Sequence, residues 1–517
     1  MLIRLITIIA LVSMSIRFSW AVDTREIPAV LCMSGDEQPF GQSTFEGMQM
    51  AFDEANARSS NGPRLTIKVY DEKSTVEAAK QAARQIVDSG APFVIGSVFS
   101  YLSLVEGPVF AQGNVAALAD ATSDLITRNP TTFRVLFKNS DEGELLANYA
   151  ARVLHLSRLA VISSDDAYGN TLRSGFEPAA DHLGLTATYT TFKTDEEAVQ
   201  AARSVAADPT RPAVVLLMLD GPASRVLPIL HRGGVTTPIL GGDSLGDENL
   251  SARMAGQPEE KGRRGTLTDG LYGLTPIVLD SANADAVDFA ARFHARYGHE
   301  PTWNATAGYD LGLLAIAVEQ NGLSGDGLSG DSPEQRRAAV LAYLQSLKNP
   351  SAAIAGVLGP IWFDKDHGRL QGMRMARFDA GHLASAPLQI LPVSSPDASE
   401  VASGAVFDMG SGHYARIQRV VYTGIYVNEI PRIDLAQSSF GADFYLWLRY
   451  AANAGPGASD PTDLIFPNMV SGGFDPSHPA EERAMPDGTT YRLWRVRAHF
   501  EMTMTCDCFR LTNSACG

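Results

Sequence analysis

The chain has 517 residues, a formal net charge of −16 and a hydrophobic fraction of 45%. This composition is typical of a globular protein and excludes a disordered or fibrous chain. The excess of acidic over basic residues argues against nucleic acid and anionic membranes as main partners, and the length is sufficient for about three domains.

The N-terminus has the parts of a secretory signal peptide. Arg4 forms a positive n-region, residues 5–14 form an apolar h-region, and residues 19–21 (SWA) place small residues where a signal peptidase reads them. A retained anchor is the alternative, but the apolar run is short for a membrane span and Arg17 interrupts it. We expect cleavage after Ala21 and a periplasmic or extracellular mature protein without a membrane span.

From residue 27 onward, strand-like apolar runs alternate with segments of helical periodicity. The strand-like runs are IPAVLCMSG, RLTIKVYDE, PFVIGSVFS, VAALADAT, FRVLF, RLAVISSDDAYG, LTATYTTF, AVVLLMLD and PILGGDS. Helices are expected over 43–57, 75–88, 101–112, 141–154, 169–183, 195–207, 222–233, 281–297 and 303–320. Val/Ile/Leu strands between helices indicate parallel strands that are covered on both faces. This predicts an α/β fold with two doubly wound, Rossmann-like lobes.

Residues 405–500 have a different character. The segments RVVYTGIYVNEIPRIDL, SFGADFYLWLRY and YRLWRVRAHFEM alternate aromatic or branched residues with polar ones, which is typical of strands. An all-β unit is therefore expected over 405–517, after a linker at 394–404. A hairpin is expected in GPIWFDKDHGRL, within 359–393.

The four cysteines fall into two groups. Cys32 lies in a strand-like run and is expected to be a buried small apolar residue. Cys506, Cys508 and Cys516 near the C-terminus suit either a disulfide or a metal knuckle, and their pairing is left open. Because no histidine completes a zinc spacing, no metal is expected.

Polar and aromatic residues follow the predicted strands, where ligands bind in open α/β sheets. Helix N-termini beside Ser100 and Thr122 offer N–H groups to an anion, and Asp243 can accept a ligand ammonium. Phe40 and Tyr168 can wall the apolar part of a ligand. Each residue type is also common in helix caps and turns, but the combination predicts a site for an amino-acid zwitterion. The candidate site residues are Phe40, Ser100, Ala121, Thr122, Tyr168, Leu219 and Asp243.

Five segments resemble the type 1 periplasmic binding proteins of the leucine/isoleucine/valine-binding group. They are SGDEQPFGQSTFEGMQMAFDEAN, FVIGSVFS, ALADATSDLI, DDAYGN and ILGGDSL, in this order within residues 27–393. The resemblance implies two lobes joined by three crossovers, a ligand trapped between them and no cofactor. It also implies that Ser100, Ala121 and Thr122 hold the ligand carboxylate, Asp243 the ammonium, and that Phe40 and Tyr168 line the cleft.

The expected division places 22–138 and 275–356 in lobe 1, and 139–274 and 357–393 in lobe 2. Two departures from the family pattern affect the ligand. Asp120 falls beside the expected carboxylate site, and Tyr101 and Leu102 replace part of a Ser/Thr-rich stretch. The ligand is therefore expected among amino acids, short amides and related solutes, without a preference for branched-chain amino acids.

The C-terminal segment resembles the start of the extracellular domain of bacterial pentameric ligand-gated channels. The aromatic run of β-like residues FYLWLRY (444–450) carries most of this resemblance. The chain departs from the family after Met504, where TCDCFRLTNSACG follows and no pore-forming helices do. A truncated channel-like domain is therefore expected.

Three functions fit these observations. The first is a non-enzymatic binding protein that delivers a solute to an ABC-type amino-acid transporter. The second is a ligand-sensing module of a receptor or channel-like protein, which the C-terminal unit favours. The third is a GDSL-type hydrolase, from Gly242-Asp243-Ser244-Leu245 and the distant Asp475-Pro476-Ser477-His478; it is disfavoured because the serine follows a late strand and the histidine lies in another domain.

Overall fold

The computed structural model describes residues 24–59, 62–323, 332–410, 412–452, 460–486 and 488–502. The predicted signal peptide lies outside the described residues, as do Cys506, Cys508, Cys516 and the chain after Met504. In these described ranges, no helix combines the length and the apolar character that crossing a membrane requires.

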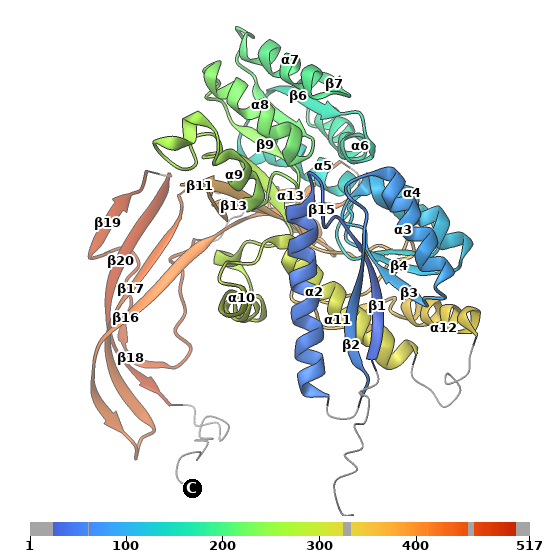
Figure 1. Cartoon of the computed structure of the whole chain (residues 1–517). Helices are drawn as coiled ribbons and strands as arrows, with labels where there is room; N and C mark the ends of the chain where they lie inside the picture. Colours follow the sequence, from blue (N-terminus) through green and yellow to red (C-terminus); the bar gives the residue numbers. More distant parts are fainter. Residues whose placement is uncertain are drawn as a thin grey trace, which may run out of the picture.

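The first lobe is built on a parallel sheet in the order β2-β1-β3-β4-β5. Alternate residues of β1 enter different cores: Ala29 and Leu31 pack with α2 and α11, whereas Val30 packs with α3 and α4. Helices therefore cover both faces of the sheet (Figure 1), as the continuous apolar runs predict. The strands are β1 (Thr24–Leu31), β2 (Arg64–Asp71), β3 (Phe93–Ile95), β4 (Ala116–Ala119) and β5 (Thr132–Arg134). The helices are α2 (Gln38–Arg58), α3 (Val76–Asp88), α4 (Ser100–Gln112), α10 (Ala284–Tyr297), α11 (Trp303–Ala317) and α12 (Pro333–Ser346).

The second lobe contains a sheet in the order β12-β11-β10-β9-β8-β6-β7. Strands β6 to β10 are parallel, and β11 and β12 are antiparallel to their neighbours. Val161 and Ile162 of β6 lie in separate cores on opposite faces. The strands are β6 (Arg158–Ser164), β7 (Thr186–Phe192), β8 (Ala213–Leu217), β9 (Ile239–Gly241), β10 (Tyr272–Thr275), β11 (Arg374–Asp379) and β12 (His382–Ser385). The helices are α5 (Asn139–Asn148), α6 (Ala167–His182), α7 (Asp195–Ala206), α8 (Asp220–Arg232) and α9 (Glu248–Met254).

The chain passes between the lobes three times: between β5 and α5, between β10 and α10, and before β11. The third passage comes later than the expected boundary at residue 357. Val357 and Phe363 lie in the core of lobe 1, and Gly368 forms a β-bridge with Arg134 of β5. Buried contacts therefore keep residues 357–369 with lobe 1.

A small antiparallel sheet in the order β13-β15-β14 follows the two lobes. Its elements are β13 (Leu388–Val393), α13 (Ala398–Ser403), β14 (Phe407–Asp408) and β15 (Tyr414–Arg419). Ile390, Met409 and Ala415 are buried in a core of lobe 2. The expected start of the all-β unit at residue 405 therefore falls inside a sheet that packs on lobe 2.

The C-terminal unit is an antiparallel sheet, which confirms the predicted all-β character. Its order is β16-β17-β20-β18, with β19 also paired to β20. Phe444, Leu446, Val496 and Phe500 form one core on a single face of this sheet, which extends away from the lobes (Figure 1). The strands are β16 (Val421–Asp434), β17 (Ser439–Ala451), β18 (Met469–Gly473), β19 (Glu481–Ala484) and β20 (Thr489–Glu501).

Helices α2 and α11 approach each other closely because glycines stand at their contact. A Cβ atom added at Gly308 would lie 2.2 Å from the carbonyl oxygen of Thr44, and one added at Gly47 would lie 1.9 Å from that of Ala305. Both atoms belong to backbone that a helix holds in place. These two helices carry Phe40 and Trp303, so their close packing positions one wall of the cleft described below.

We expect Gly308→Ala to lower the free energy of unfolding by about 2 kcal/mol, because the added methyl forces the two helices apart. The midpoint of urea unfolding, followed by far-UV circular dichroism, measures the effect. Gly221→Ala is the matched control: this glycine is also helical and a Cβ there meets nothing within 4 Å. Equal midpoints for the two variants would contradict the role assigned to Gly308.

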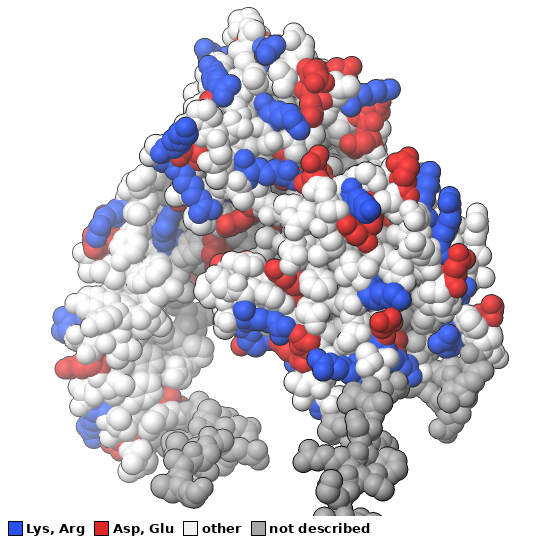
Figure 2. Space-filling view, in the orientation of Figure 1, with Lys and Arg blue, Asp and Glu red and all other residues white. Residues whose placement is uncertain are grey.

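Basic and acidic side chains are interspersed over the face of the molecule shown in Figure 2. On that face they form pairs rather than a continuous basic surface.

Candidate functional site in the interlobe cleft

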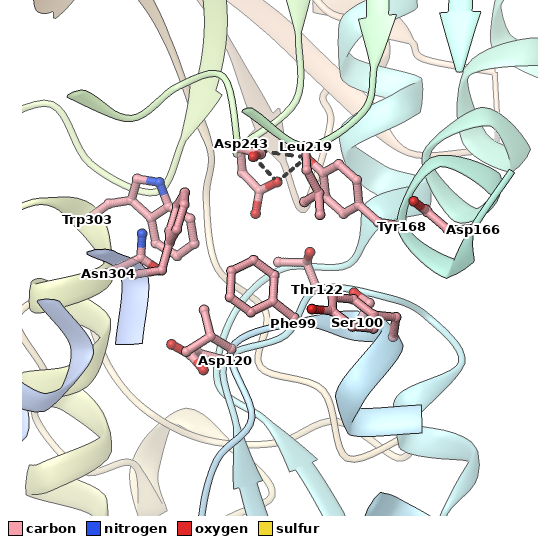
Figure 3. A pocket seen from close by; sticks show the side chains of 14 residues that line it. Phe99, Ser100, Asp120, Thr122, Asp166, Tyr168, Leu219, Asp243, Trp303 and Asn304 are labelled. Atoms are coloured by element: carbon pink, nitrogen blue, oxygen red, sulfur yellow. Dashed lines mark hydrogen bonds between the residues drawn. The ribbon is translucent and has the colours of Figure 1, made fainter. Parts of the chain in front are cut away.

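A pocket lies between the two lobes and is bordered by residues from both (Figure 3). Its empty volume is about 470 Å³, including the part open to solvent. The side chains that meet there are nearly all buried, so the two lobes are closed over the pocket. The lining residues from lobe 1 are Phe40, Val98, Phe99, Ser100, Tyr101, Asp120, Thr122, Trp303 and Asn304, and those from lobe 2 are Asp166, Tyr168, Leu219, Asp243 and Ser244.

The lobe 2 wall is organised around Asp243, which follows β9. The Tyr168 hydroxyl donates to Asp243 Oδ1 at 2.5 Å, and the Ser244 N–H donates to the same oxygen at 2.9 Å. The N–H of Asp243 donates to Oε1 of the buried Glu142 at 2.8 Å. These bonds fix the Asp243 carboxylate at the pocket surface, where it can accept a hydrogen bond from a ligand.

The lobe 1 wall presents hydroxyls beside the start of a helix. Helix α4 begins at Ser100 and has no side-chain cap. The Ser100 Oγ accepts a hydrogen bond from the Ser123 N–H at 3.2 Å, and the Thr122 side chain is buried in the same pocket. A helix N-terminus and two hydroxyls are suited to an anion.

Aromatic rings enclose the space between these polar walls. Phe40 and Phe99 pack edge to face with ring centroids 5.5 Å apart, and Phe99 and Tyr101 lie 6.0 Å apart. Trp303 joins them from the first turn of α11, where the Thr302 hydroxyl caps the helix by accepting from the Ala305 N–H at 3.2 Å. The pocket is therefore apolar in the middle and polar at its ends, as small-molecule sites usually are.

Burial perturbs the carboxyls of the pocket. It raises the pKa of Asp243 to about 6, although hydrogen bonds from Tyr168, Ser244 and Thr122 lower it. Burial also raises the pKa of Asp120 to about 7, with the charges of Glu72 and Asp243 adding to the effect. Strong perturbation of several carboxyls in one cleft is typical of a functional site.

One ion pair and two hydrogen bonds join the lobes beside the pocket. Arg253 of lobe 2 donates to Asp220 of its own lobe and, across the cleft, to Glu37 Oε2 at 3.2 Å and to the Asp36 carbonyl at 2.9 Å. The Asn304 amide of lobe 1 donates to Asp247 Oδ2 of lobe 2 at 3.3 Å. These contacts cross from one lobe to the other, so they stabilise the closed arrangement seen here.

Most candidate residues from the sequence meet in this pocket. The structure places Phe40, Ser100, Thr122, Tyr168, Leu219 and Asp243 in its lining. Ala121 is not among them: its side chain packs in a small core with Ala119 and Ile126. Successive side chains of extended backbone point to opposite sides, so Asp120 and Thr122 face the pocket and the methyl of Ala121 faces away.

Trp303 and Asn304 line the pocket although they do not follow a strand. They enter the pocket from α11, which follows helix α10 rather than a strand. In the sequence, Pro301-Thr302-Trp303 indicates the start of a helix. This helix belongs to lobe 1. Only the fold shows that this helix begins at the cleft.

The two halves of the hydrolase motif lie in different parts of the molecule. The Ser244 Oγ accepts a hydrogen bond from the Asp220 N–H at 2.9 Å in lobe 2. His478 lies in the C-terminal unit, and its Nδ1 is 2.7 Å from Asp475 Oδ2 and 2.9 Å from Ser477 Oγ. His478 therefore does not reach Ser244, and the GDSL-type arrangement is not formed.

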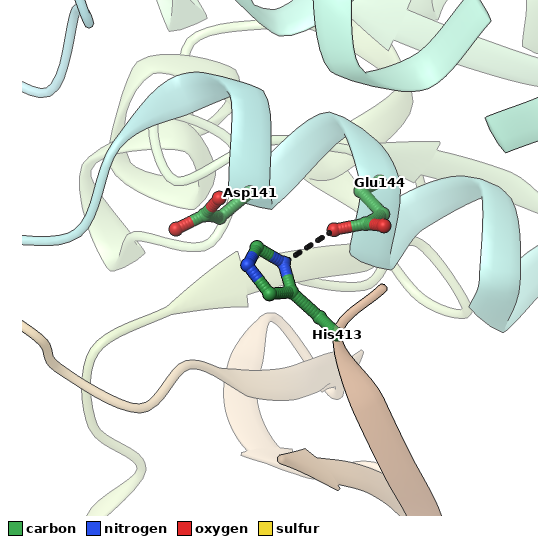
Figure 4. Close-up of side chains that lie close together, drawn as sticks. All are labelled: Asp141, Glu144 and His413. Carbon is green, nitrogen blue, oxygen red and sulfur yellow. Dashed lines mark hydrogen bonds and ion pairs between the residues drawn. The ribbon is translucent and has the colours of Figure 1, made fainter. Parts of the chain in front are cut away.

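A second cluster of ionisable groups joins α5 to the loop before β15 (Figure 4). His413 Nδ1 lies 3.3 Å from Glu144 Oε2, and Asp141 is the third member. The Lys138 ammonium lies 3.3 Å from Asp141 Oδ1 and balances its charge. These contacts join the β14–β15 loop to helix α5 of lobe 2.

The raised carboxyl pKa values predict how stability depends on pH. Unfolded aspartates lose their protons near pH 3.9, whereas folded Asp120 keeps its proton until about pH 7. Between these values the native state binds more protons than the unfolded state, so the contribution of Asp120 to stability falls as pH rises from about 4 to 7. We expect Asp120→Asn to be more stable than the parent at pH 8 by about 4 kcal/mol.

Thermal unfolding of the ligand-free chain at pH 5 and pH 8 checks this expectation. The Tm gain of Asp120→Asn should be larger at pH 8 than at pH 5. A gain that is equal at both pH values, or a loss confined to pH 8, would show that the Asp120 carboxyl is not destabilised by burial.

With the fold and the cleft described, the class of the protein follows. A family model described as "Periplasmic binding protein" matches residues 24–382. The chain therefore belongs to the periplasmic binding protein family, which confirms the family part of the sequence interpretation.

Curated relatives and solved structures agree with this family. The Leu/Ile/Val/Thr-binding protein of Salmonella typhimurium is 22% identical over 377 residues, covering 71% of this chain and 94% of the relative. Leu/Ile/Val-binding protein homolog 3 of Brucella melitensis is 26% identical over 164 residues, which is 31% of this chain and 45% of the relative. The aligned region thus spans about half the length of some of these relatives.

Two solved structures share the two-lobed fold. The leucine-binding protein LivK of Thermotoga maritima superposes with a TM-score of 0.60 at 23% identity, covering 70% of this chain and 97% of that one. The substrate-binding protein LivJ of Streptococcus pneumoniae, in complex with isoleucine, gives a TM-score of 0.59 at 20% identity, with coverages of 70% and 98%. In both, the shared part leaves out nearly a third of this chain.

Proposed function

We propose that this protein captures an amino acid or a related small amide between its two lobes, as the substrate-binding component of an ABC-type transport system. The observation that carries the proposal is the complementarity of the two walls of one buried pocket. Asp243 of lobe 2 can accept the ligand ammonium, and Ser100, Thr122 and the start of α4 in lobe 1 can hold its carboxylate.

Closure of the lobes supports this function physically. A ligand that contacts both walls stabilises the closed state by its difference in affinity between the closed and open states. The Arg253 contacts to Asp36 and Glu37 add to that closed state. A permease would then recognise the closed protein in the periplasm or outside the cell. Relatives with names or bound ligands of the branched-chain amino-acid group support this class of solute.

A thermal-shift screen of the whole chain against the common amino acids and short amides tests the proposal. A ligand that binds the native state raises the Tm, so at least one amino acid or amide should raise it in a concentration-dependent way. Asp243→Ala should abolish that shift at the same ligand concentration. No shift with any amino acid or amide at millimolar concentration would contradict the proposal.

A ligand-sensing role is a second candidate, and one contact favours it. Tyr422 of β16 donates its hydroxyl to Asp280 Oδ2 at 2.7 Å, and Asp280 lies within the crossover segment between β10 and α10. Asp280 also accepts from the N–H and hydroxyl of Ser385 in lobe 2. A movement of the lobes would thus be transmitted to the C-terminal sheet. We propose that this sheet is related to the extracellular domain of pentameric ligand-gated channels.

Amide hydrogen exchange with and without ligand separates the two roles. A sensor should show changed protection in β16 and β17 when the cleft is filled, and Tyr422→Phe should reduce that change without altering ligand affinity. Protection changes confined to the two lobes would indicate a carrier alone.

A further inference from the structure

Asp120 is a buried carboxyl in the pocket that has no partner. Its side chain is 1% exposed and lines the pocket, and neither carboxyl oxygen has a hydrogen-bond partner in the structure. Burying a carboxyl without a partner costs several kcal/mol in general. A ligand that enters the pocket can supply the missing partner.

Among the described residues, Asp120 is the one buried aspartate with neither carboxyl oxygen hydrogen-bonded; Glu106 shares this feature but does not line the pocket. Asp310 accepts from Arg369 at 3.0 Å, Asp220 accepts from Arg253, and Asp243 accepts from Tyr168 and Ser244. Of the residues that line the pocket in the described part of the chain, three are aspartates and none is Lys, Arg or His. The pocket therefore has three carboxyl groups and no basic side chain of its own that could pair with them.

A second acceptor without a partner belongs to the same wall. The Oδ1 atom of Asn304 is buried and has no hydrogen-bond partner, while the Nδ2 atom of this residue is bonded to Asp247. In Figure 3, Asp120 lies on the side of the Phe99 ring that is nearer to Trp303 and Asn304. Ser100 and Thr122, the proposed carboxylate site, lie on the other side of that ring. In that view, Asp120 and Asn304 both lie away from the proposed carboxylate site.

The aromatic surroundings of Asp120 and Asn304 are suited to a cation. Phe99 and Trp303 line the pocket beside Asp120 and Asn304, and the face of an aromatic ring attracts an ammonium or guanidinium group. An ammonium group carries three N–H donors and a guanidinium five, which matches the free oxygens of Asp120 and Asn304. A neutral aliphatic side chain would leave these oxygens buried and without partners.

We propose that the ligand is a basic amino acid, whose side-chain cation binds Asp120 and Asn304 while its ammonium and carboxylate occupy the ends described above. This inference rests on the proposed function and specifies its solute class. A zwitterion with an apolar side chain brings no net charge to a pocket lined by Asp120, Asp166 and Asp243, whereas a lysine-like or arginine-like solute brings one positive charge. Asp120 is then the residue that determines specificity.

Titration calorimetry of the whole chain with L-lysine, L-arginine and L-norleucine tests the inference. Norleucine has the carbon skeleton of lysine without the terminal ammonium. The parent protein should bind lysine or arginine at least tenfold more tightly than norleucine. Asp120→Asn should lose most of that preference and bind norleucine equally well or better, because the buried charge is gone.

Glu106→Gln is the matched control, because Glu106 is also a buried carboxyl of lobe 1 but does not line the pocket. This variant should keep the preference for the basic amino acids. Norleucine binding as tightly as lysine to the parent would overturn the inference and leave the proposed function intact, whereas no binding of any amino acid would overturn both. If Asp120→Asn does not fold, the comparison of lysine with norleucine on the parent still decides.

Discussion

Replacing Asp243 by alanine is expected to weaken binding of an amino-acid ligand by tenfold or more. The Asp243 carboxylate is held at the pocket surface by Tyr168 and Ser244, in the position where it can accept the ligand ammonium. Loss of a hydrogen bond to a charged group costs about 1.5–3 kcal/mol, which corresponds to roughly 10- to 150-fold in affinity. Titration calorimetry with a ligand identified by the thermal-shift screen measures the change.

Two further variants test whether the loss of ligand affinity comes from removing the negative charge of Asp243. Asp243→Asn keeps the size of the side chain and an oxygen that can accept from Tyr168, so its affinity should fall nearly as far as that of Asp243→Ala. Asp165→Ala removes an aspartate that also follows a strand of lobe 2 but lies outside the pocket, and it should bind as the parent does. An unchanged affinity in Asp243→Ala would refute the role of this carboxylate.

Asp310→Ala is expected to lower the free energy of unfolding by about 3–5 kcal/mol. Asp310 and Arg369 form an ion pair at 3.0 Å in which both side chains are almost fully buried. Asp310 also accepts from the N–H groups of Val357 and Leu358, at 2.6 and 3.2 Å. Removing one member of a buried pair leaves an uncompensated charge, which is the source of the large cost. Urea unfolding followed by circular dichroism measures it.

A double-mutant cycle gives the control. In Asp310→Ala/Arg369→Met no buried charge remains, so the double variant should lose less stability than the sum of the two single variants. Additive losses would show that the two side chains act independently. The ion pair fixes α11 against the segment that leads to the third crossover, so ligand affinity should fall with stability in the single variants.

The sequence was sufficient to predict the two parallel-sheet lobes. Runs such as RLAVISS and AVVLL became the fully covered strands β6 and β8, because a strand buried on both faces has no polar face to interrupt its apolar residues. Cys32 proved to be fully buried, as expected. The third crossover and the β13–β15 pairing could not be predicted, because they depend on contacts between residues far apart in the chain.

The site residues that could be predicted from the sequence are those that directly follow a strand. Tyr168 and Asp243 follow strands that are neighbours of β8 in the sheet of lobe 2, so the fold brings them together. Trp303 follows no strand, and the lack of a partner for Asp120 becomes visible only in three dimensions. Ala121 was predicted to be a site residue but does not line the pocket. The alternation of side chains at the end of β4 turns its methyl away.

A crystal structure of the protein with its amino-acid ligand would test the central claim most directly. The ammonium of the bound ligand should lie within hydrogen-bond distance of Asp243, with its carboxylate beside Ser100 and Thr122, so that one molecule contacts both lobes. A ligand that touches a single lobe, or one bound outside this pocket, would contradict the account.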